Sequence, residues 1–369
     1  MRTSVVLITL ALLASGCQHE VMEPDVVLIE KRLVLPEEPY NYQDEFPESF
    51  DHPLLNLLES IPGENPLTNE GATLGRILFY DQALSIDGSI SCGSCHHQEN
   101  AFADPVRFSE GINGFVTDRN SMALFNMQFH RRLFWDTRTN GLENQVLEPI
   151  QHPGEMGLTL EQMVERIEGK EYYPTLFEDA FGDATVTTQR VSFALSQFIR
   201  SLKSYRSKYD QGLAEGFAHF TDEEIHGMKL YFSGEATCNH CHTTANFFSS
   251  QPLNTGLDEV YNDPGLGGVT GNPEDNGRFK PVSLRNLSFT APYMHDGRFE
   301  TLEEVIDHYN SGVQAHPNLD DRLTYENTVG GTPEPLLLSE VEKAALKAFL
   351  LTLDDYEFIQ DERFSDPFH

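Results

Sequence analysis

The chain has 369 residues, of which 58 are Asp or Glu and 25 are Lys or Arg, so its formal net charge is −33 at pH 7. This excess of negative charge argues against a nucleic-acid partner, because nucleic-acid-binding surfaces are basic, and it favours electrostatic steering of a basic partner at low salt. Hydrophobic residues make up 39% of the chain, and 25 of its residues are Phe. With this length, the composition indicates a soluble body of two domains.

Residues 1–17 have the pattern of an export signal. A charged start precedes an apolar run over residues 5–13, too short to span a membrane, and small residues lead from there to Cys17. We predict a bacterial lipoprotein signal, a lipid anchor on Cys17 and a periplasmic location. Simple secretion is the alternative, because Leu is more usual where Ala14 stands. Residues 18–50 are rich in Asp, Glu and Pro without a sustained period, which predicts an acidic tether.

Helical periodicity dominates the remaining sequence, and strand signals are weak. Capping boxes, in which Ser or Thr is followed three residues later by Glu or Gln, mark helix starts. Such boxes begin at Thr159, Thr221, Thr301 and Ser339. The predicted fold is therefore mostly α, with helices joined by long loops.

Two copies of one short motif carry the chemistry: Cys92-Gly93-Ser94-Cys95-His96 and Cys238-Asn239-His240-Cys241-His242. Each is the pattern of covalent c-type haem attachment, in which the thiols add to porphyrin vinyl groups and the histidine becomes the proximal iron ligand. The fifth cysteine is Cys17, so none is left for a disulfide. Zinc is the alternative, but zinc ribbons place their Cys pairs about 15–20 residues apart, and these pairs lie far more widely apart. We predict two haems, with His96 and His242 as iron ligands.

The two halves of the chain repeat a common plan. Matching segments precede and follow the two motifs, with one gap: 74–80 with 227–232, 119–120 with 285–286, and 134–138 with 294–298. We therefore predict two cytochrome c-like haem domains related by internal duplication, over residues 51–215 and 216–369.

The duplication aligns Trp135 with His295 and, further on, Pro149 with Tyr309. If this segment lies over the distal face of each haem, the first half presents a proline that cannot bind iron, where the second presents a phenol. The first haem would be open to a small molecule, and the second would be closed and would mainly pass electrons. His308 is a competing ligand, but adjacent residues on a helix point about 100° apart, so at most one of His308 and Tyr309 faces the iron.

Several further motifs are separated along the chain: Leu74-Gly75-Arg76 with Leu78-Phe79-Tyr80-Asp81, Phe134-Trp135-Asp136, Leu142-Glu143-Asn144-Gln145, Pro149, Glu155-Met156-Gly157, and Thr290-Ala291-Pro292-Tyr293-Met294-His295-Asp296-Gly297. With both haem motifs, this combination resembles the bacterial di-haem cytochrome c peroxidase family, and within it the branch related to the methylamine-utilisation enzyme MauG. The resemblance runs from about Asn56 to the C-terminus.

In that family the N-terminal haem reacts with peroxide, and the family's distal glutamine, proline and glutamate correspond to Gln145, Pro149 and Glu155. The resemblance implies that Glu155 takes a proton from the inner peroxide oxygen and returns it to the outer one, while Gln145 orients peroxide or holds the carboxylate. A solvated loop acid is the alternative for Glu155. Trp135, the only tryptophan, corresponds to the family's electron-relaying aromatic between the haems; core packing is the alternative.

The resemblance also implies a calcium ion between the haems, with ligands corresponding to Asn120, Thr290 and Pro292, and oxygen ligands suit this ion.

The chain departs from the pattern of well-known family members at two places. Well-known members keep the first haem closed with a loop histidine until the second is reduced, but residues 108–114 contain no histidine, so no reductive activation is expected. Those members carry Met as the second ligand of haem 2. This chain has Tyr309 there, and the MauG branch also has tyrosine. A phenolate ligand should lower the reduction potential of haem 2.

The leading hypothesis is a di-haem peroxidase, an oxidoreductase that reduces hydrogen peroxide to water. Electrons from a periplasmic donor, such as a small basic cytochrome c, would enter through the C-terminal haem. The alternative is MauG-like oxidation of a protein substrate by peroxide-derived high-valent iron, which Tyr309 favours. A third hypothesis, a pure electron-transfer cytochrome, gives no reason for Gln145, Pro149 and Glu155 together. The family is often dimeric, which allows a homodimer here.

Overall fold

The computed structural model describes residues 32–233, 236 and 238–369. The predicted signal peptide, the lipid anchor on Cys17 and residues 18–31 of the predicted tether lie outside these residues. Within the described part of the chain, no helix has both the length and the apolar character needed to cross a bilayer.

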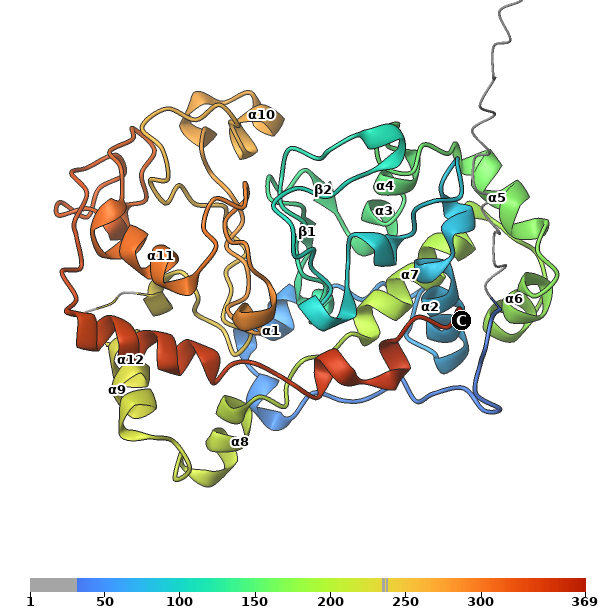
Figure 1. Ribbon diagram of the computed structural model, residues 1–369, viewed down its shortest axis with the longest axis horizontal. Coiled ribbons are helices and arrows are strands. Elements are labelled where there is room, and N and C mark those ends of the chain that lie inside the picture. Colours follow the sequence, from blue (N-terminus) through green and yellow to red (C-terminus); the bar gives the residue numbers. More distant parts are fainter. Residues whose placement is uncertain (1–31, 234–235, 237) are drawn as a thin grey trace, which may run out of the picture. The chain divides into compact units, whose positions relative to one another are not determined.

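The prediction of a mostly helical chain is confirmed. The helices are α1 Pro53–Leu58, α2 Asn69–Tyr80, α3 Leu142–Gln145, α4 Glu148–Gln151, α5 Leu160–Glu168, α6 Tyr173–Phe181, α7 Thr188–Ser201, α8 Lys208–Glu215, α9 Asp222–Phe232, α10 Leu266–Thr270, α11 Leu302–Asp307 and α12 Glu340–Leu351. The described strands are short: β1 (Arg132–Leu133) pairs antiparallel with β2 (Thr139–Asn140), with Arg132 opposite Asn140. Long loops join these elements (Figure 1).

Each predicted capping box opens a helix. The side chains of Thr159, Thr221, Thr301 and Ser339 accept hydrogen bonds from the backbone N–H three residues later, and the acidic or amide side chain at that position bonds back to the cap. These boxes open α5, α9, α11 and α12. They satisfy backbone donors that would otherwise have no partner at the helix start.

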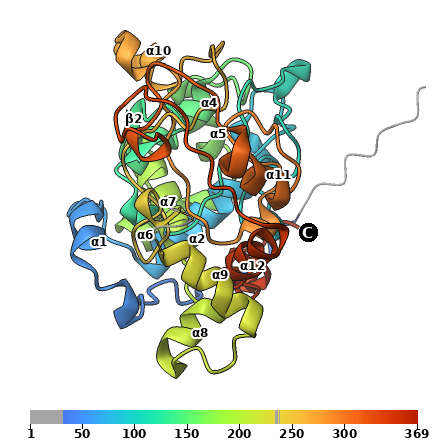
Figure 2. The same ribbon diagram turned by 90° about the vertical axis from the view of Figure 1, so that its left-hand side faces the viewer.

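Two close helix crossings build the cores beside the haem motifs. Helix α2 packs on α7, and α9 packs on α12 (Figures 1 and 2). At the first crossing a side chain on Gly75 would overlap the carbonyl group of Ala194, and at the second a side chain on Gly227 would overlap that of Ala345. Glycine therefore permits backbone contact at both crossings, and each lies shortly before a Cys-x-x-Cys-His motif.

Matching backbone conformations recur along the two halves of the sequence. Asn126 and Asn286 both adopt the left-handed conformation, and each precedes a short 3-10 turn. The same interval along the chain relates Phe134 to Met294, which are also left-handed. In local geometry Asn286 therefore corresponds to Asn126. The sequence match, which needed a gap, paired it instead with Asn120, and that pairing stays a prediction.

The predicted tether ends earlier than expected. The Val34 N–H donates to the carbonyl of Pro367 at 2.9 Å, and the buried Tyr42 donates its hydroxyl to the carbonyl of Arg363 at 3.0 Å. The segment 33–50 is thus fastened to the C-terminal tail at Val34 and Tyr42, and Phe50 is buried beside Phe129, so the prediction of a free tether is wrong for this segment. Burial of a few aromatic side chains outweighs the acidic composition of this segment.

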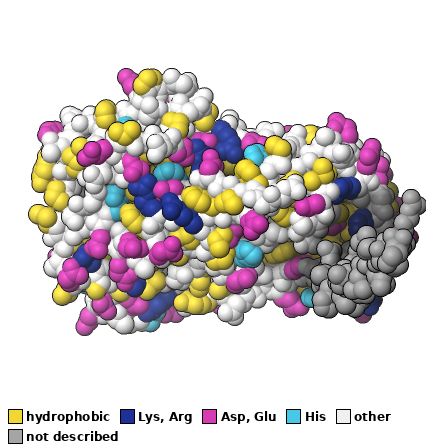
Figure 3. All heavy atoms as spheres, turned by 45° about the horizontal axis from the view of Figure 1, so that its top comes forward, with side chains coloured by type: hydrophobic (Ala, Val, Ile, Leu, Met, Phe, Trp, Pro, Cys, Tyr) yellow, Lys and Arg dark blue, Asp and Glu magenta, His cyan; other side chains and the backbone are white. Residues whose placement is uncertain are grey.

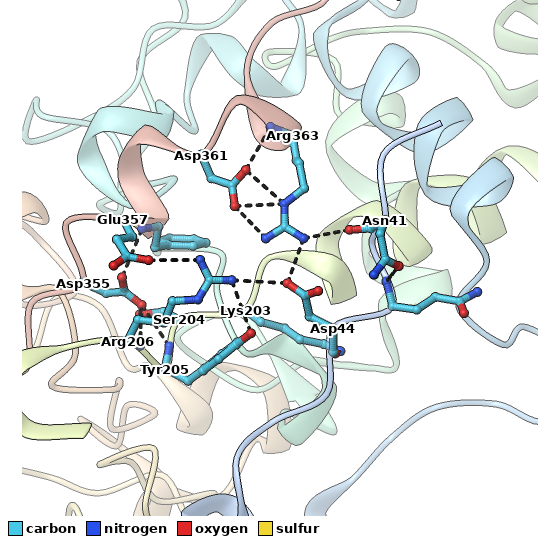
Figure 4. A network of polar contacts seen from close by, with 12 residues as sticks. Asn41, Asp44, Lys203, Ser204, Tyr205, Arg206, Asp355, Glu357, Asp361 and Arg363 are labelled. Carbon is cyan, nitrogen blue, oxygen red and sulfur yellow. Dashed lines mark hydrogen bonds and ion pairs between the residues drawn. The ribbon is translucent and has the colours of Figure 1, made fainter. Parts of the chain in front are cut away.

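A polar network joins the beginning, middle and end of the described chain (Figure 4). Asp44 accepts hydrogen bonds from Arg206 and Arg363, at 3.3 and 2.8 Å. The carboxylate of Asp355 accepts the backbone N–H groups of Tyr205 and Arg206, both at 2.9 Å. These contacts hold the segment between α7 and α8 to both ends of the chain.

The last residues cross back to the helices of the first half. Phe358 and Phe364 are buried in the hydrophobic cluster built mainly by α2 and α7, whereas α9, α11 and α12 build a second cluster. The boundary near residue 215 stays a prediction. The C-terminal tail, assigned to the second domain by sequence, packs with residues of the first.

Candidate functional site

A cavity of about 700 Å³ is lined by both Cys-x-x-Cys-His motifs. Each predicted site residue also lines this cavity, although they come from separate loops and turns: Asn120, Trp135, Gln145, Pro149, Glu155, Thr290, Pro292 and Tyr309. The fold therefore brings the predicted site residues together. Their individual roles stay predictions.

The two motif histidines are held in the same way. Nδ1 of His96 donates to the carbonyl of Phe102 at 2.7 Å, and Nδ1 of His242 donates to that of Phe247 at 3.0 Å. This bond fixes the neutral tautomer and leaves Nε2 available to a metal. Burial lowers the pKa of both imidazoles, that of His242 to about 4, so each remains in the neutral form that binds iron.

The four motif cysteines are free thiols. Burial raises the pKa of Cys92 and Cys238 to about 12. Half-buried, unpaired thiols beside an accessible imidazole nitrogen, on the wall of a large and largely apolar cavity, fit two covalently attached haems. Among the described residues no group of three or more His, Cys, Asp and Glu side chains could hold a metal ion.

Glu155 lies in a tight turn after α4. Its backbone N–H donates to the carbonyl of His152 at 3.1 Å, and Nδ1 of His152 lies 3.5 Å from the Glu155 carboxylate. The carboxylate side chain is 36% exposed. Partial burial raises the pKa of Glu155, and the nearby His152 and Arg138 oppose that rise. A carboxyl group with a raised pKa at the cavity wall is suited to both accepting and returning a proton.

The loop predicted to lack a haem ligand lies directly against Glu155. The Ile112 N–H donates to the carbonyl of Glu155 at 3.2 Å, and Gly111 packs so closely on the Gly154 carbonyl that a side chain would overlap it. Ser109 and Gly111 line the cavity. The first haem position is thus bordered on this side by small residues.

Trp135 is fixed at both its ring and its backbone. The indole Nε1 donates to the carbonyl of Asn120 at 2.9 Å, and the Trp135 carbonyl accepts the Lys280 N–H at 2.8 Å. Its ring meets that of His295 edge-on, with centroids 6.5 Å apart. Trp135 therefore contacts residues from both halves of the sequence.

Tyr309 lies in a π-helical turn, His308–Gly312, that follows α11. Its side chain lines the cavity, and burial raises its pKa. His308 does not line the cavity; its Nε2 lies 3.0 Å from the carbonyl of Thr255. The adjacent side chains thus point in different directions, as the helical spacing predicted.

Two cavity-lining groups were missed by sequence reasoning, Lys280 and His130. Neither belongs to a recognisable motif, and both are almost completely buried, at 5% and 6% exposure. A buried lysine in a loop has no sequence signature, so only the structure identifies these residues.

The comparisons with known proteins agree with this geometry. A family model described as di-haem cytochrome c peroxidase matches residues 69–216. The methylamine utilization protein MauG of Methylorubrum extorquens is 33% identical over 320 residues, which cover 83% of this chain and 82% of that protein. The chain belongs to the di-haem cytochrome c peroxidase family. It is an oxidoreductase of a family that carries two haems, and it has both motifs needed to hold them.

Other members of the di-haem cytochrome c peroxidase family show similar agreement. The cytochrome c551 peroxidase of Nitrosomonas europaea is 32% identical over 254 residues, which cover 68% of this chain and 75% of that protein. The crystal structure of a MauG-like protein associated with microbial copper homeostasis superposes with a TM-score of 0.74 at 33% identity, covering 89% of this chain and 99% of that one.

Proposed function

We propose that this protein is a di-haem peroxidase that reduces hydrogen peroxide to water with electrons from a periplasmic donor. The observation that carries the proposal is the common cavity: Gln145, Pro149 and Glu155 line it together with His96. A proline, an amide and a carboxyl group beside the proximal histidine make a site open to a small oxidant. A pure electron-transfer cytochrome would have no use for them.

The residues that would hold the haems are Cys92, Cys95 and His96 at the first site and Cys238, Cys241 and His242 at the second. Bound there, haem iron supplies peroxide binding at the first site and one-electron exchange at both. The cysteines would attach each haem covalently, and His96 and His242, held by hydrogen bonds to backbone carbonyls, would ligate the iron.

Glu155 is the proposed acid–base residue. Its carboxylate accepts a proton from the inner oxygen of peroxide, and the carboxylic acid returns it to the outer oxygen, which leaves as water. Two electrons from the donor and two protons from solvent then complete the reduction of the remaining oxygen to a second water. Gln145, on α3, orients peroxide. Pro149, on α4, contributes no ligating atom and so keeps this side of the cavity accessible.

Trp135 is the proposed relay between the two haem positions, and Tyr309 is the proposed second ligand of the C-terminal haem, where electrons enter. The position of Trp135 between residues of both halves supports the first assignment. Burial of Tyr309 in the cavity wall supports the second. We also propose calcium near Asn120, Thr290 and Pro292, all of which line the same cavity.

An acidic surface suits a basic donor such as a small cytochrome c. The net charge is −33, and Asp and Glu side chains are spread over the face in Figure 3, with a smaller group of Lys and Arg toward its middle. Long-range attraction of this kind raises association rates and weakens with added salt. The donor, a periplasmic location, the internal duplication and a lipid anchor at Cys17 are parts of this proposal, and a homodimer is compatible with it.

The second candidate function is MauG-like oxidation of a protein substrate with peroxide. Tyr309 favours it, because the relatives include two proteins named MauG, at 33% and 32% identity, and tyrosine is the ligand expected in that branch. The two functions require the same peroxide site. They differ in where the oxidising equivalents go.

Steady-state peroxide turnover with reduced cytochromes as donors separates the two functions. Fast turnover, followed by rapid return of the resting spectrum, is expected for the peroxidase. Poor turnover with every donor, together with a long-lived oxidised spectrum after peroxide is added to the ferric protein, would favour oxidation of a protein substrate. Absence of any reaction with peroxide would contradict both.

A further inference from the structure

The cavity contains a cation for which the protein provides no anion. Lys280 is 5% exposed and lines the cavity, and its backbone N–H donates to the carbonyl of Trp135 at 2.8 Å. Within the described part of the chain, no carboxylate lies within 4.0 Å of its ammonium group, and no side-chain hydrogen bond of Lys280 is found. Burial of an unpaired ammonium group costs several kcal/mol, so a partner is needed.

The arginines of the same cavity differ from Lys280. Arg119, Arg138, Arg285 and Arg322 each pair with a carboxylate within 3.2 Å. The protein thus satisfies each of these guanidinium groups from its own side chains. Burial alone lowers the pKa of Lys280, to about 7, and no neighbouring carboxylate opposes it.

A second buried nitrogen lies close to this lysine. His130 is 6% exposed, lines the cavity and stacks at 4.1 Å on the ring of Phe248. Its Nδ1 is buried without a hydrogen-bond partner, and the charge of Lys280 lowers the pKa of its imidazole further. Two basic side chains without an acid, both facing one cavity, form an anion site.

We propose that Lys280 and His130 bind a propionate carboxylate of one of the two haems, with the ammonium group as its counter-ion and the imidazole as a hydrogen-bond donor. This inference rests on haem attachment at both motifs. The thioether bonds place the vinyl edge of each porphyrin at the cysteines. The charged groups near the cysteines are not Lys280 or His130; Cys241, for example, has Arg322 as a neighbour. The propionates lie at the edge opposite the vinyl groups, and the proposal assigns Lys280, which lines the cavity beside Trp135, to one of them.

Hydrogen peroxide is not a suitable occupant, because it is uncharged near neutral pH and cannot neutralise an ammonium group. A propionate is held next to the site by the covalent bonds of its own haem, so no binding from solution is needed. The pairing has an electrical consequence: a cation beside the propionate offsets its negative charge and thereby raises the reduction potential of that haem.

The test compares Lys280→Met, Lys280→Arg and the control Lys170→Met in the haem-loaded protein. Lys170 is exposed on the surface, so its substitution makes the same change in net charge. Spectroelectrochemistry gives the potential of each haem, and resonance Raman spectra report the propionate bending modes. We expect Lys280→Met to change the ferric–ferrous equilibrium of one haem at least tenfold toward ferric, a fall of about 59 mV for one electron, with altered propionate bending modes.

Lys280→Arg should retain most of the wild-type potential, and Lys170→Met all of it. Unchanged potentials in a haem-loaded Lys280→Met protein, or a shift with unchanged propionate modes, would overturn the proposal. So would a wild-type potential that follows the concentration of added acetate, which would indicate an anion from solution.

If Lys280→Met does not attach haem, His130→Phe is measured in its place. It should shift the same modes of the same haem by a smaller amount, and unchanged modes would again overturn the proposal. Pyridine haemochrome assays of the wild-type protein test haem attachment separately, so failure of the family assignment would be recognised independently.

Discussion

Pro149 and Tyr309 line one cavity from corresponding places in the sequence: Pro149 lies seven residues after Leu142, the first residue of α3, and Tyr309 lies seven residues after Leu302, the first residue of α11. The first position offers no atom that can bind iron, whereas the second offers a buried phenol. This difference between the two positions supports the proposal of one reactive and one closed haem.

Replacement of Tyr309 should therefore change the second haem alone. We expect Tyr309→Lys to alter the low-spin electron paramagnetic resonance signal and to shift the potential of that haem, while both haems remain covalently attached. His308→Ala is the matched control, because His308 does not line the cavity and its Nε2 bonds to the carbonyl of Thr255. A native low-spin signal in Tyr309→Lys would show that another residue binds the iron.

Glu155→Gln should keep both haems and the resting spectrum but slow the reaction with peroxide by about 100-fold or more, the scale of a positioned acid–base group. The amide retains the size of the side chain and cannot accept the peroxide proton. Stopped-flow mixing of ferric protein with peroxide measures the rate. Glu165→Gln, an exposed glutamate on α5, should react at the wild-type rate; equal rates in both variants would remove Glu155 from the mechanism.

The pH dependence of this rate should follow the ionisation of Glu155. The carboxylate is the base that starts the reaction, so the rate should rise with pH through a pKa above the ordinary value of 4.5, since burial raises it. Arg138 lowers that pKa, so Arg138→Gln should move the rise to higher pH and Arg138→Lys should largely restore it. A profile unaffected by Arg138→Gln would contradict the assignment.

The loop over residues 108–114 leads to a prediction about activation. It contacts Glu155 through Ile112 and contains no histidine, so it offers no ligand that reduction must displace. The ferric protein should react with peroxide at once, without prior electron transfer. A lag that disappears after one electron per molecule is added would show that another ligand closes the first haem.

Much of the site could be predicted because its chemistry is local in sequence. The haem-attachment motif requires Cys95 and His96 to be adjacent, so it can be recognised in the sequence. Neighbouring residues on a helix point about 100° apart, so the different directions of His308 and Tyr309 could also be predicted. The capping boxes at Thr221 and Thr301 succeed for the same reason. Each depends on residues three positions apart.

The failures depend on distant parts of the chain. Residues 33–50 have the composition of a tether but gain burial from a C-terminal tail more than three hundred residues away. Lys280 is of interest because no carboxylate of the described residues lies near its ammonium group in the folded protein. A single sequence does not show which side chains surround a buried residue, so this feature could not be predicted.

The last prediction concerns Asp354, which is 3% exposed at the end of α12. One carboxyl oxygen accepts the Ser288 N–H at 3.3 Å, and the other is buried without a partner. Burial raises the pKa of Asp354 from 3.8 to about 6. The folded state therefore binds the proton more tightly than the unfolded state, and the stability from this group is present below pH 3.8 and is lost as the pH rises through 6.

Asp354→Asn cannot ionise, so the variant should not lose stability as the pH rises. Its amide oxygen can still accept the hydrogen bond from the Ser288 N–H. The variant should unfold at a higher urea concentration than the wild type at pH 7.5, with a gain in unfolding free energy of at most about 3 kcal/mol, and should match it near pH 4, where both side chains are neutral. Unfolding curves of the two haem-loaded proteins at both pH values measure the effect. A variant less stable than wild type at pH 7.5 would mean that the ionised carboxylate has a cationic partner, such as a bound metal ion.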